Sequence, residues 1–432
     1  MRWQISVFVR WVVCGVVLSF GTGCGTFRTL KNELMQLRMS ENYMANISAP
    51  DGQSGPVYGV ILDYTRDGRI LAGDLAQANS AGMVVFLMPP ARGEGYHWFA
   101  FQDQNRDEHW QQGEPCAFLP ATKDTSIHTE IKLSQHPEAA PPGQLLATIR
   151  EMRHGRPLAE LQTGAAVPVS LGKVASINDA VFAAEGGAQG LWQPATFLHQ
   201  RGIGVYFLDD YDPAKIPVLF VHGAAGSGQD WKNIIHALDR KKYQAWIAVY
   251  PTGLALDKSA TAIHSALKIL HGMYRFERLH VVAHSMGGLM ARAMILKNRV
   301  EEGNLYIRTF VTLSTPWNGH EAAAWGVEKA PTAVPSWYDV QTDSPFIRTL
   351  FKTDLSRSVE HHLLFGYAAS RSRLLPDSND GTVSVASQLD ARAQKQARAI
   401  YGFDVDHMGI LQNPECLEKL FDLLDSASQQ KL

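Results

Sequence analysis

Ser285 lies between small residues at the end of an apolar run, in the stretch LHVVAHSMGGLMAR from Leu279 to Arg292. The apolar run is typical of a buried strand, and the residues from Gly287 onward have the pattern of a helix. A sharp strand-to-helix turn that exposes a serine hydroxyl needs small residues two places before and after it, here Ala283 and Gly287. The spacing therefore predicts a nucleophile that attacks a carbonyl carbon.

A serine hydroxyl also needs a base, because at its free pKa it is a poor nucleophile. His407, in FDVDHMGIL, follows a strand-like run and precedes the C-terminal helix, so we predict it as that base. His320, His361 and His362 compete for the role. The last two lead into a strand rather than leaving one, which makes them weaker candidates.

The carboxylate that orients the base should lie between the serine and the histidine in the chain, on a loop after a late strand. The stretch LLPDSNDGTVSV supplies Asp377 and Asp380, and we predict Asp380 because DGTV places its carboxylate on a tight turn. Asp404 and Asp406 are the fallback candidates, although Asp406 adjoins His407 and would have difficulty reaching its imidazole.

The stretch PVLFVHGAAGSG ends a second predicted strand in His-Gly and continues as a loop of small residues. Such a loop can aim backbone N–H groups at the oxyanion formed when Ser285 attacks. We predict the amides of Ala224 and Met286 as the donors, each typically worth about 10²–10³ in rate. His222 is expected to orient this loop rather than act as the base.

From about residue 165, β-branched apolar runs alternate with helix-length segments, which predicts a mostly parallel sheet with helices on both faces. Residues 316–360 form too long a connection for an ordinary loop and predict a cap or lid. Its aromatic residues either pack the cap onto the core or offer a surface to an acyl chain or a membrane interface. They are Trp317, Trp325, Trp337, Tyr338 and Phe346.

Residues 57–140 alternate short apolar runs with turn signals, which predicts a small all-β domain, a sandwich, joined to the rest by a linker over 141–164. The stretch DQNRDEHWQQGE resembles a calcium loop but has Glu108 where that loop needs glycine. We therefore favour a solvated acidic turn over a calcium site. Four residues match the template: Asp103, Asn105, Asp107 and Glu114.

Residues 1–24 have the composition of an export signal. Their ten-residue apolar segment would span about 15 Å as a helix, about half of a hydrocarbon core, so a permanent transmembrane helix is the poorer interpretation. A buried N-terminal strand or helix is the other alternative. Residues 25–56 are predicted to form a tether.

The small residues before Cys24 resemble a bacterial lipoprotein signal, in which the cysteine carries the lipid. Gly21 stands where such signals usually have leucine, which leaves ordinary cleavage and secretion, or release into the periplasm, as the alternative. Gly25 replaces the aspartate that retains lipoproteins in the inner membrane. The resemblance thus implies an exported outer-membrane lipoprotein of the cell envelope.

Composition bounds the remaining choices. The 432 residues are 45% hydrophobic and 19% charged with a formal net charge of −2, which fits two or three globular domains and gives no sign of nucleic-acid binding. Outside the signal and Cys24, only Cys116 and Cys416 remain. They allow a disulfide but have no metal-ligand spacing, so we expect no metal and no organic cofactor.

The segment 165–432 resembles the α/β-hydrolase superfamily. The motifs FVHGAAG, AHSMGGLMAR, LSTPWNGH, DGTV and DHMGIL are similar to the lipase and esterase branch, including relatives of inositol deacylases that act on lipid anchors. The resemblance implies Ser285 as nucleophile, His407 as general base and acid, and Asp380 as its orienting carboxylate. It does not extend to the β-rich domain, whose ligand is unknown.

These patterns together predict a serine hydrolase of carboxylic esters at the cell envelope, acting through an acyl-enzyme on lipid-like or other acyl substrates. An acyltransferase that uses the same three residues is one alternative. An envelope binding or scaffold protein without activity is another. A peptidase is less favoured because no charged specificity pocket can be identified.

Overall fold

The computed structural model describes residues 23–428 apart from 53, 123–128, 138–140, 152–163, 356–358 and 369–377. The predicted signal segment, except its last two residues, lies outside the described residues. The chain divides into two compact units. The α/β unit contains Met1–Glu33, Gly172–Phe197 and Ile203–Leu432, and the β unit contains Leu34–Leu171 and Leu198–Gly202.

An eight-stranded sheet in the order β15-β14-β13-β12-β10-β11-β9-β8 forms the centre of the α/β unit. Strands β10 to β15 pair in parallel, and β9 is antiparallel to β11. The central strands β11 and β12 are buried along their whole length, as their continuous apolar sequences require. The strands are β8 (Val169–Val174), β9 (Ile203–Phe207), β10 (Ile216–Val221), β11 (Tyr243–Val249), β12 (Leu279–His284), β13 (Ile307–Leu313), β14 (Glu360–Gly366) and β15 (Ala397–Phe403).

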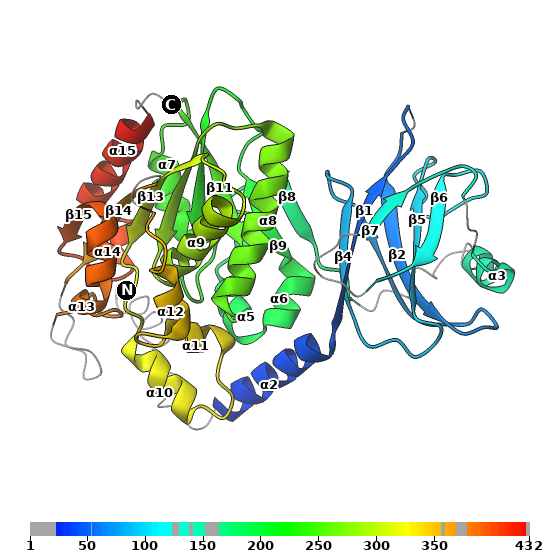
Figure 1. Ribbon diagram of the computed structural model, residues 1–432, viewed down its shortest axis with the longest axis horizontal. Helices are drawn as coiled ribbons and strands as arrows, with labels where there is room; N and C mark the ends of the chain where they lie inside the picture. Colours follow the sequence, from blue (N-terminus) through cyan, green and yellow to red (C-terminus); the bar gives the residue numbers. More distant parts are fainter. Residues whose placement is uncertain are drawn as a thin grey trace, which may run out of the picture. The chain divides into compact units, whose positions relative to one another are not determined.

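Helices cover this sheet, and β11 and β13 are seen between α15 and α8 in Figure 1. Helices α7 and α15 share one apolar cluster with strand side chains, while α8 and α9 pack against each other. This arrangement is an α/β-hydrolase fold, so the predicted fold class is confirmed. The helices outside the cap are α5 (Glu185–Trp192), α6 (Pro194–Arg201), α7 (Lys232–Ala237), α8 (Leu256–Tyr274), α9 (Met286–Leu296), α13 (Val385–Gln388), α14 (Ala391–Gln396) and α15 (Pro414–Ser428).

Three helices follow β13 and precede β14, in the segment predicted as a cap: α10 (Glu321–Lys329), α11 (Pro335–Val340) and α12 (Pro345–Leu350). They gather at one end of the unit in Figure 1. Trp317 is fully buried and packs edge-on against Phe310 and Phe351. Trp325 and Tyr338 are 44% and 52% exposed. Trp317 therefore packs the cap onto the core, whereas Trp325 and Tyr338 lie on its surface.

The β unit is a sandwich of two sheets, ordered β4-β1-β7 and β3-β2-β5-β6. Side chains from both sheets, among them Tyr43, Ile61, Phe86 and Trp98, form one apolar core between them. The pair β1–β7 is parallel and the other pairs are antiparallel. The strands are β1 (Glu41–Ser48), β2 (Val57–Tyr64), β3 (Ile70–Gln77), β4 (Met83–Met88), β5 (Tyr96–Gln102), β6 (Cys116–Pro120) and β7 (Thr129–Lys132).

Two predicted connections contain regular structure instead. The predicted tether 25–56 holds most of helix α2 (Gly23–Met39) and all of β1. Helix α2 is docked, because Phe27 packs edge-on against Trp192 and the carboxylate of Glu33 accepts the amide and hydroxyl of Thr196. The predicted linker 141–164 holds helix α3 (Gly143–Glu151), whose Ile149 packs on an apolar face of the β unit.

The acidic turn between β5 and β6 is exposed at residues 104–108, as predicted, but two of its carboxylates are buried. Asp103 is fully buried, and its carboxylate accepts the amides of Arg106 at 2.6 Å and Glu108 at 2.8 Å. Both oxygens of Glu114 accept backbone amides as well, each at 2.8 Å. These carboxylates organise the loop, and the described residues contain no cluster of His, Cys, Asp or Glu that could hold a metal ion.

Two further expectations concern cysteines and membrane spans. Cys116 and Cys416 are both free and buried, one in each unit, so no disulfide joins them. Cys24 lies in the first turn of α2. Among the described helices, none combines the length and the apolar character needed to cross a bilayer.

Candidate active site

Ser285 occupies a strained turn between β12 and α9. Its φ of 54° and ψ of −133° are rare for a residue with a side chain, and its amide donates to the carbonyl of Leu313 at 2.9 Å. A Cβ on Gly287 would lie 2.3 Å from the carbonyl oxygen of His222, and one on Gly223 would lie 2.8 Å from the Cβ of Ser285. The close approach of these segments explains why glycine is needed both in the turn, at Gly287, and in the loop after β10, at Gly223.

Ser285, His407 and Asp380 form one chain of hydrogen bonds, although they follow β12, β15 and β14 and lie far apart in sequence. The Oγ of Ser285 lies 2.9 Å from Nε2 of His407, and Nδ1 of His407 lies 2.7 Å from Oδ2 of Asp380. All three side chains are buried. The structure therefore brings together the three residues that the sequence singles out.

The carboxylate of Asp380 is fixed by its own turn. Its Oδ1 accepts the amides of Thr382 at 3.0 Å and Val383 at 2.7 Å. Burial alone would raise the pKa of Asp380, but the charge and hydrogen bond of His407 together with these amides hold it below the ordinary value. The carboxylate thus stays ionised while it faces the imidazole.

His284 is a residue of this site that the sequence analysis did not single out. Its Nε2 donates to the carbonyl oxygen of His407 at 2.9 Å, which fixes the backbone that carries the base. Burial and then the charge of His407 lower the pKa of His284 to about 3, so it stays neutral. In the sequence, its position just before Ser285 was the one sign that His284 belongs to the site.

The predicted oxyanion donors belong to the start of α9 and to the loop after β10. Met286 is the first residue of α9, where an amide has no acceptor within the helix. Ala224 is exposed in the loop after β10, and this loop touches the serine through Gly223. The next residue, Ala225, has a φ of 51° and donates its amide to Oγ1 of Thr252 at 3.1 Å.

The other histidines have partners elsewhere. His222 stacks on Tyr250 with ring centroids 4.5 Å apart, and burial lowers its pKa to about 4, which fits the predicted role in the loop. His361 lies 2.9 Å from Oγ1 of Thr312 inside the sheet, and His362 lies beside it on β14. Nδ1 of His320 accepts the amide of Ala322 and caps α10.

The alternative acids are not part of the hydrogen-bonded chain. Asp377 lies outside the described residues. Asp404 is exposed, and Oδ1 of Asp406 accepts the amide of Gly409 at 2.6 Å. Asp380 is therefore the described aspartate whose carboxylate reaches His407.

Arg292, in the helix that follows the serine, is another buried residue whose role sequence reasoning missed. Its guanidinium donates to the carbonyls of Leu350 at 3.0 Å and Thr353 at 3.1 Å, and stacks over the ring of Phe351. These contacts tie the end of the cap helix α12 to α9. A second hydrogen bond links the cap to the segment near Asp380: Oγ of Ser384 donates to Oε1 of Glu321 on α10 at 2.8 Å.

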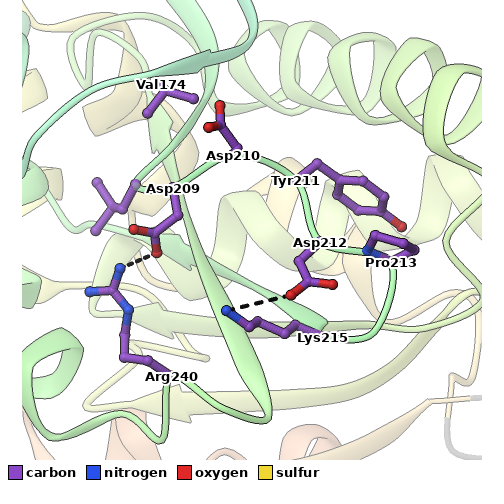
Figure 2. Close-up of a pocket in the computed structure, with 9 residues that line it drawn as sticks. Val174, Asp209, Asp210, Tyr211, Asp212, Pro213, Lys215 and Arg240 are labelled. Atoms are coloured by element: carbon purple, nitrogen blue, oxygen red, sulfur yellow. Dashed lines mark hydrogen bonds and ion pairs between the residues drawn. The ribbon is translucent and has the colours of Figure 1, made fainter.

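Figure 2 shows a pocket elsewhere in the α/β unit. The loop after β9 lines it, and four of its charged groups form the ion pairs Arg240–Asp209 and Lys215–Asp212. Neither Ser285 nor His407 lines this pocket. The candidate active site is therefore the hydrogen-bonded group at Ser285 and not this hollow.

Comparison with known proteins finds a family model that matches part of the chain. A family model described as a PGAP1-like alpha/beta domain matches residues 212–329, which include Ser285 but neither Asp380 nor His407. No curated protein matches the chain.

Solved structures that are similar over about half of the chain include the following three. The product of the gene lin2722 from Listeria innocua is 17% identical, with 50% of this chain and 96% of that chain covered and a TM-score of 0.38. The mature lipase BlEst2 of Bacillus licheniformis is 17% identical, with 51% and 97% covered and a TM-score of 0.41. Aspergillus fumigatus lipase B is 16% identical, with 51% and 56% covered and a TM-score of 0.39.

Proposed function

We propose that this protein is a serine hydrolase that cleaves carboxylic esters through an acyl-enzyme intermediate. The observation that carries the proposal is the unbroken chain from Oγ of Ser285 through His407 to Asp380, at distances of 2.9 and 2.7 Å. The strained turn that presents the serine and the α/β-hydrolase fold support it. A buried serine without a base would have no comparable nucleophilicity.

The proposed reaction begins when Nε2 of His407 takes the proton of Ser285 and Oγ bonds to the ester carbonyl carbon. The carbonyl oxygen becomes an oxyanion, which the amides of Ala224 and Met286 stabilise. Asp380 accepts a hydrogen bond from the Nδ1–H group of His407 and stabilises the imidazolium without taking its proton. His407 then returns the proton to the departing alcohol, and a water molecule, activated by the same histidine, releases the acid and restores the serine.

Lipid-like esters are the proposed substrate class. The cap presents the exposed rings of Trp325 and Tyr338, a type of surface found where proteins meet acyl chains and membrane interfaces. The proposed attachment is a lipid on Cys24, which would hold an exported protein at the cell envelope, in the outer membrane. Secretion or a free periplasmic form is the alternative for the location.

The test is hydrolysis of chromogenic esters of increasing acyl length by the full chain in detergent, beside Ser285→Ala. We expect the variant to lose activity by about 10⁶, as removal of a nucleophilic serine does in enzymes of this mechanism. Ser426→Ala is the matched control, because Ser426 lies on α15 and its hydroxyl only donates to the carbonyl of Asp422.

A fluorophosphonate probe should label Ser285 and no residue of the alanine variant. If the folded wild-type chain cleaves no ester of the series and the probe leaves Ser285 unmodified, the proposal is wrong.

A further inference from the structure

The loop of residues 222–226 follows β10 and is called the oxyanion loop below. Its backbone includes a strained residue, whose conformation must be fixed by contacts with other segments. Ala225 has a φ of 51°, a region that residues with a side chain rarely adopt. Such conformations persist only where the surroundings fix them. The loop touches the nucleophile through Gly223, so its shape decides where the amide of Ala224 points.

The hydroxyl of Thr252 fixes the strained residue directly. Oγ1 of Thr252 accepts the amide of Ala225 at 3.1 Å, and Thr252 is buried. Its own backbone is anchored, because the next residue, Gly253, donates to the carbonyl of Gly190 in α5 at 2.8 Å. The acceptor is therefore held by the scaffold and not by the loop.

Tyr250, two residues earlier, fixes the start of the same loop. Its ring stacks on His222 with an interplanar angle of 12°, and its hydroxyl donates to the carbonyl oxygen of His222. Burial raises the pKa of Tyr250 well above its ordinary value, so the hydroxyl keeps its proton. The segment after β11 thus holds both ends of the bend between His222 and Ala225.

Helix α5 closes the loop from another direction. A Cβ on Gly187 would lie 1.9 Å from the carbonyl oxygen of Ala225, so the helix backbone lies directly against this peptide. The amide of Ala225 is bound to Thr252 while its carbonyl abuts α5. The two peptide groups that flank Ala225 therefore have little freedom to rotate.

We infer that Thr252 is a positioning residue of the proposed ester hydrolysis, with Tyr250 as its partner. Its hydroxyl holds the amide of Ala225 so that the preceding amide, that of Ala224, faces the carbonyl oxygen of the substrate. Thr252 itself touches no reacting atom. The inference rests on the proposed function, because it concerns the donor that function requires.

The experiment compares kcat and KM of Thr252→Val, Thr252→Ser and wild type on a short soluble ester. Valine keeps the shape of threonine and removes the acceptor, whereas serine keeps it. An oxyanion donor is worth about 10²–10³ in rate, and a displaced donor retains part of that, so we expect kcat of Thr252→Val to fall about tenfold. KM should change less than twofold, and Thr252→Ser should stay near the wild-type kcat.

Thr196→Val is the matched control, since it removes a threonine hydroxyl that donates to Glu33 on α2. It should keep the wild-type kcat. If Thr252→Val does not fold, Tyr250→Phe replaces it, because that change removes only the hydroxyl that donates to His222. The same fall in kcat at constant KM is then expected.

The inference is overturned if the folded variant keeps kcat within twofold of wild type, if only KM rises, or if Thr252→Ser falls as far as valine. These outcomes differ from failure of the proposed function, in which the wild type itself cleaves no ester.

Discussion

The backbone of Ser285 predicts an unusual stability order for two inactive variants. Ser285→Ala and Ser285→Gly both remove the nucleophilic oxygen, but only glycine adopts a φ of 54° and a ψ of −133° without strain. We therefore expect Ser285→Gly to be the more stable of the two. In most buried positions glycine is the less stable choice.

The size of the difference follows from three terms. Strain in sparsely populated backbone regions costs about 1–3 kcal/mol, and this φ/ψ pair lies close to a region that is almost reserved for glycine, so the upper end applies. Against this, glycine gains freedom in the unfolded chain worth about 0.4–1 kcal/mol. The lost Cβ removes buried apolar surface worth about 0.8 kcal/mol. The net advantage of glycine is about 1–2 kcal/mol.

Thermal unfolding followed by tryptophan fluorescence measures this difference, because most of the described tryptophans lie in the α/β unit. For a unit of this size, 1 kcal/mol corresponds to a rise in Tm of about 2–4 °C. Ser259, buried in α8, provides the control pair. There the helical backbone should make Ser259→Gly less stable than Ser259→Ala by about 1 kcal/mol.

A glycine variant at residue 285 that melts at or below the temperature of the alanine variant would refute the reasoning. The serine would then not be strained, whatever its role in the reaction.

Three further predictions concern charge, orientation and the cap. Burial lowers the pKa of His222 to about 4 and of His284 to about 3, so the unfolded chain binds their protons near pH 6.5 and the folded chain does not. The stability that is present above pH 6.5 should therefore be lost as the pH falls toward 4. At pH 5 the loss should be about 2 kcal/mol in the free energy of unfolding for each histidine. A urea midpoint that is equal at pH 7 and pH 5 would contradict this. Asp380→Asn should lower kcat by about 10⁴ with the fold intact, because the imidazolium loses its partner, and a fall of less than tenfold would exclude the assigned role. Replacing Trp325 and Tyr338 by alanine should reduce hydrolysis of vesicle-bound esters several-fold and leave short soluble esters unaffected; equal losses on both substrates would show that the rings serve the fold instead.

The positions of the three central site residues could be predicted because local sequence signals mark each of them. Ala283 and Gly287 mark the turn at Ser285, and DGTV marks the turn at Asp380. The α/β-hydrolase sheet was predictable for a similar reason, since its central strands are continuous apolar runs. The order along the chain, with the serine first, the acid second and the histidine last, then indicated which acid and which histidine belong to the site.

Other features depend on partners that are distant in sequence. Strand β1, ENYMANIS, buries only alternate side chains, so no apolar run marks it, and its pairing with β4 and β7 supplies the missing signal. Asp74 lies in the middle of strand β3, where its charge interrupts the apolar sequence. It is nevertheless buried, and its carboxylate accepts the amides of Ala165 and Ala166. Thr252 and His284 likewise gain their roles from backbone groups in other segments. No local pattern encodes such contacts.

Helix α2 ties residues near the N-terminus to the α/β unit. A flexible chain over residues 25–56 would let that unit range over roughly 30 Å from its point of attachment. Instead the helix begins at Gly23 and is docked on the unit through Phe27 and Glu33. Residues 23–33 therefore do not act as a flexible tether. If Cys24 carries the lipid proposed above, the docked helix would keep the α/β unit close to the membrane surface, and esters at that surface are the ones that Ser285 would meet.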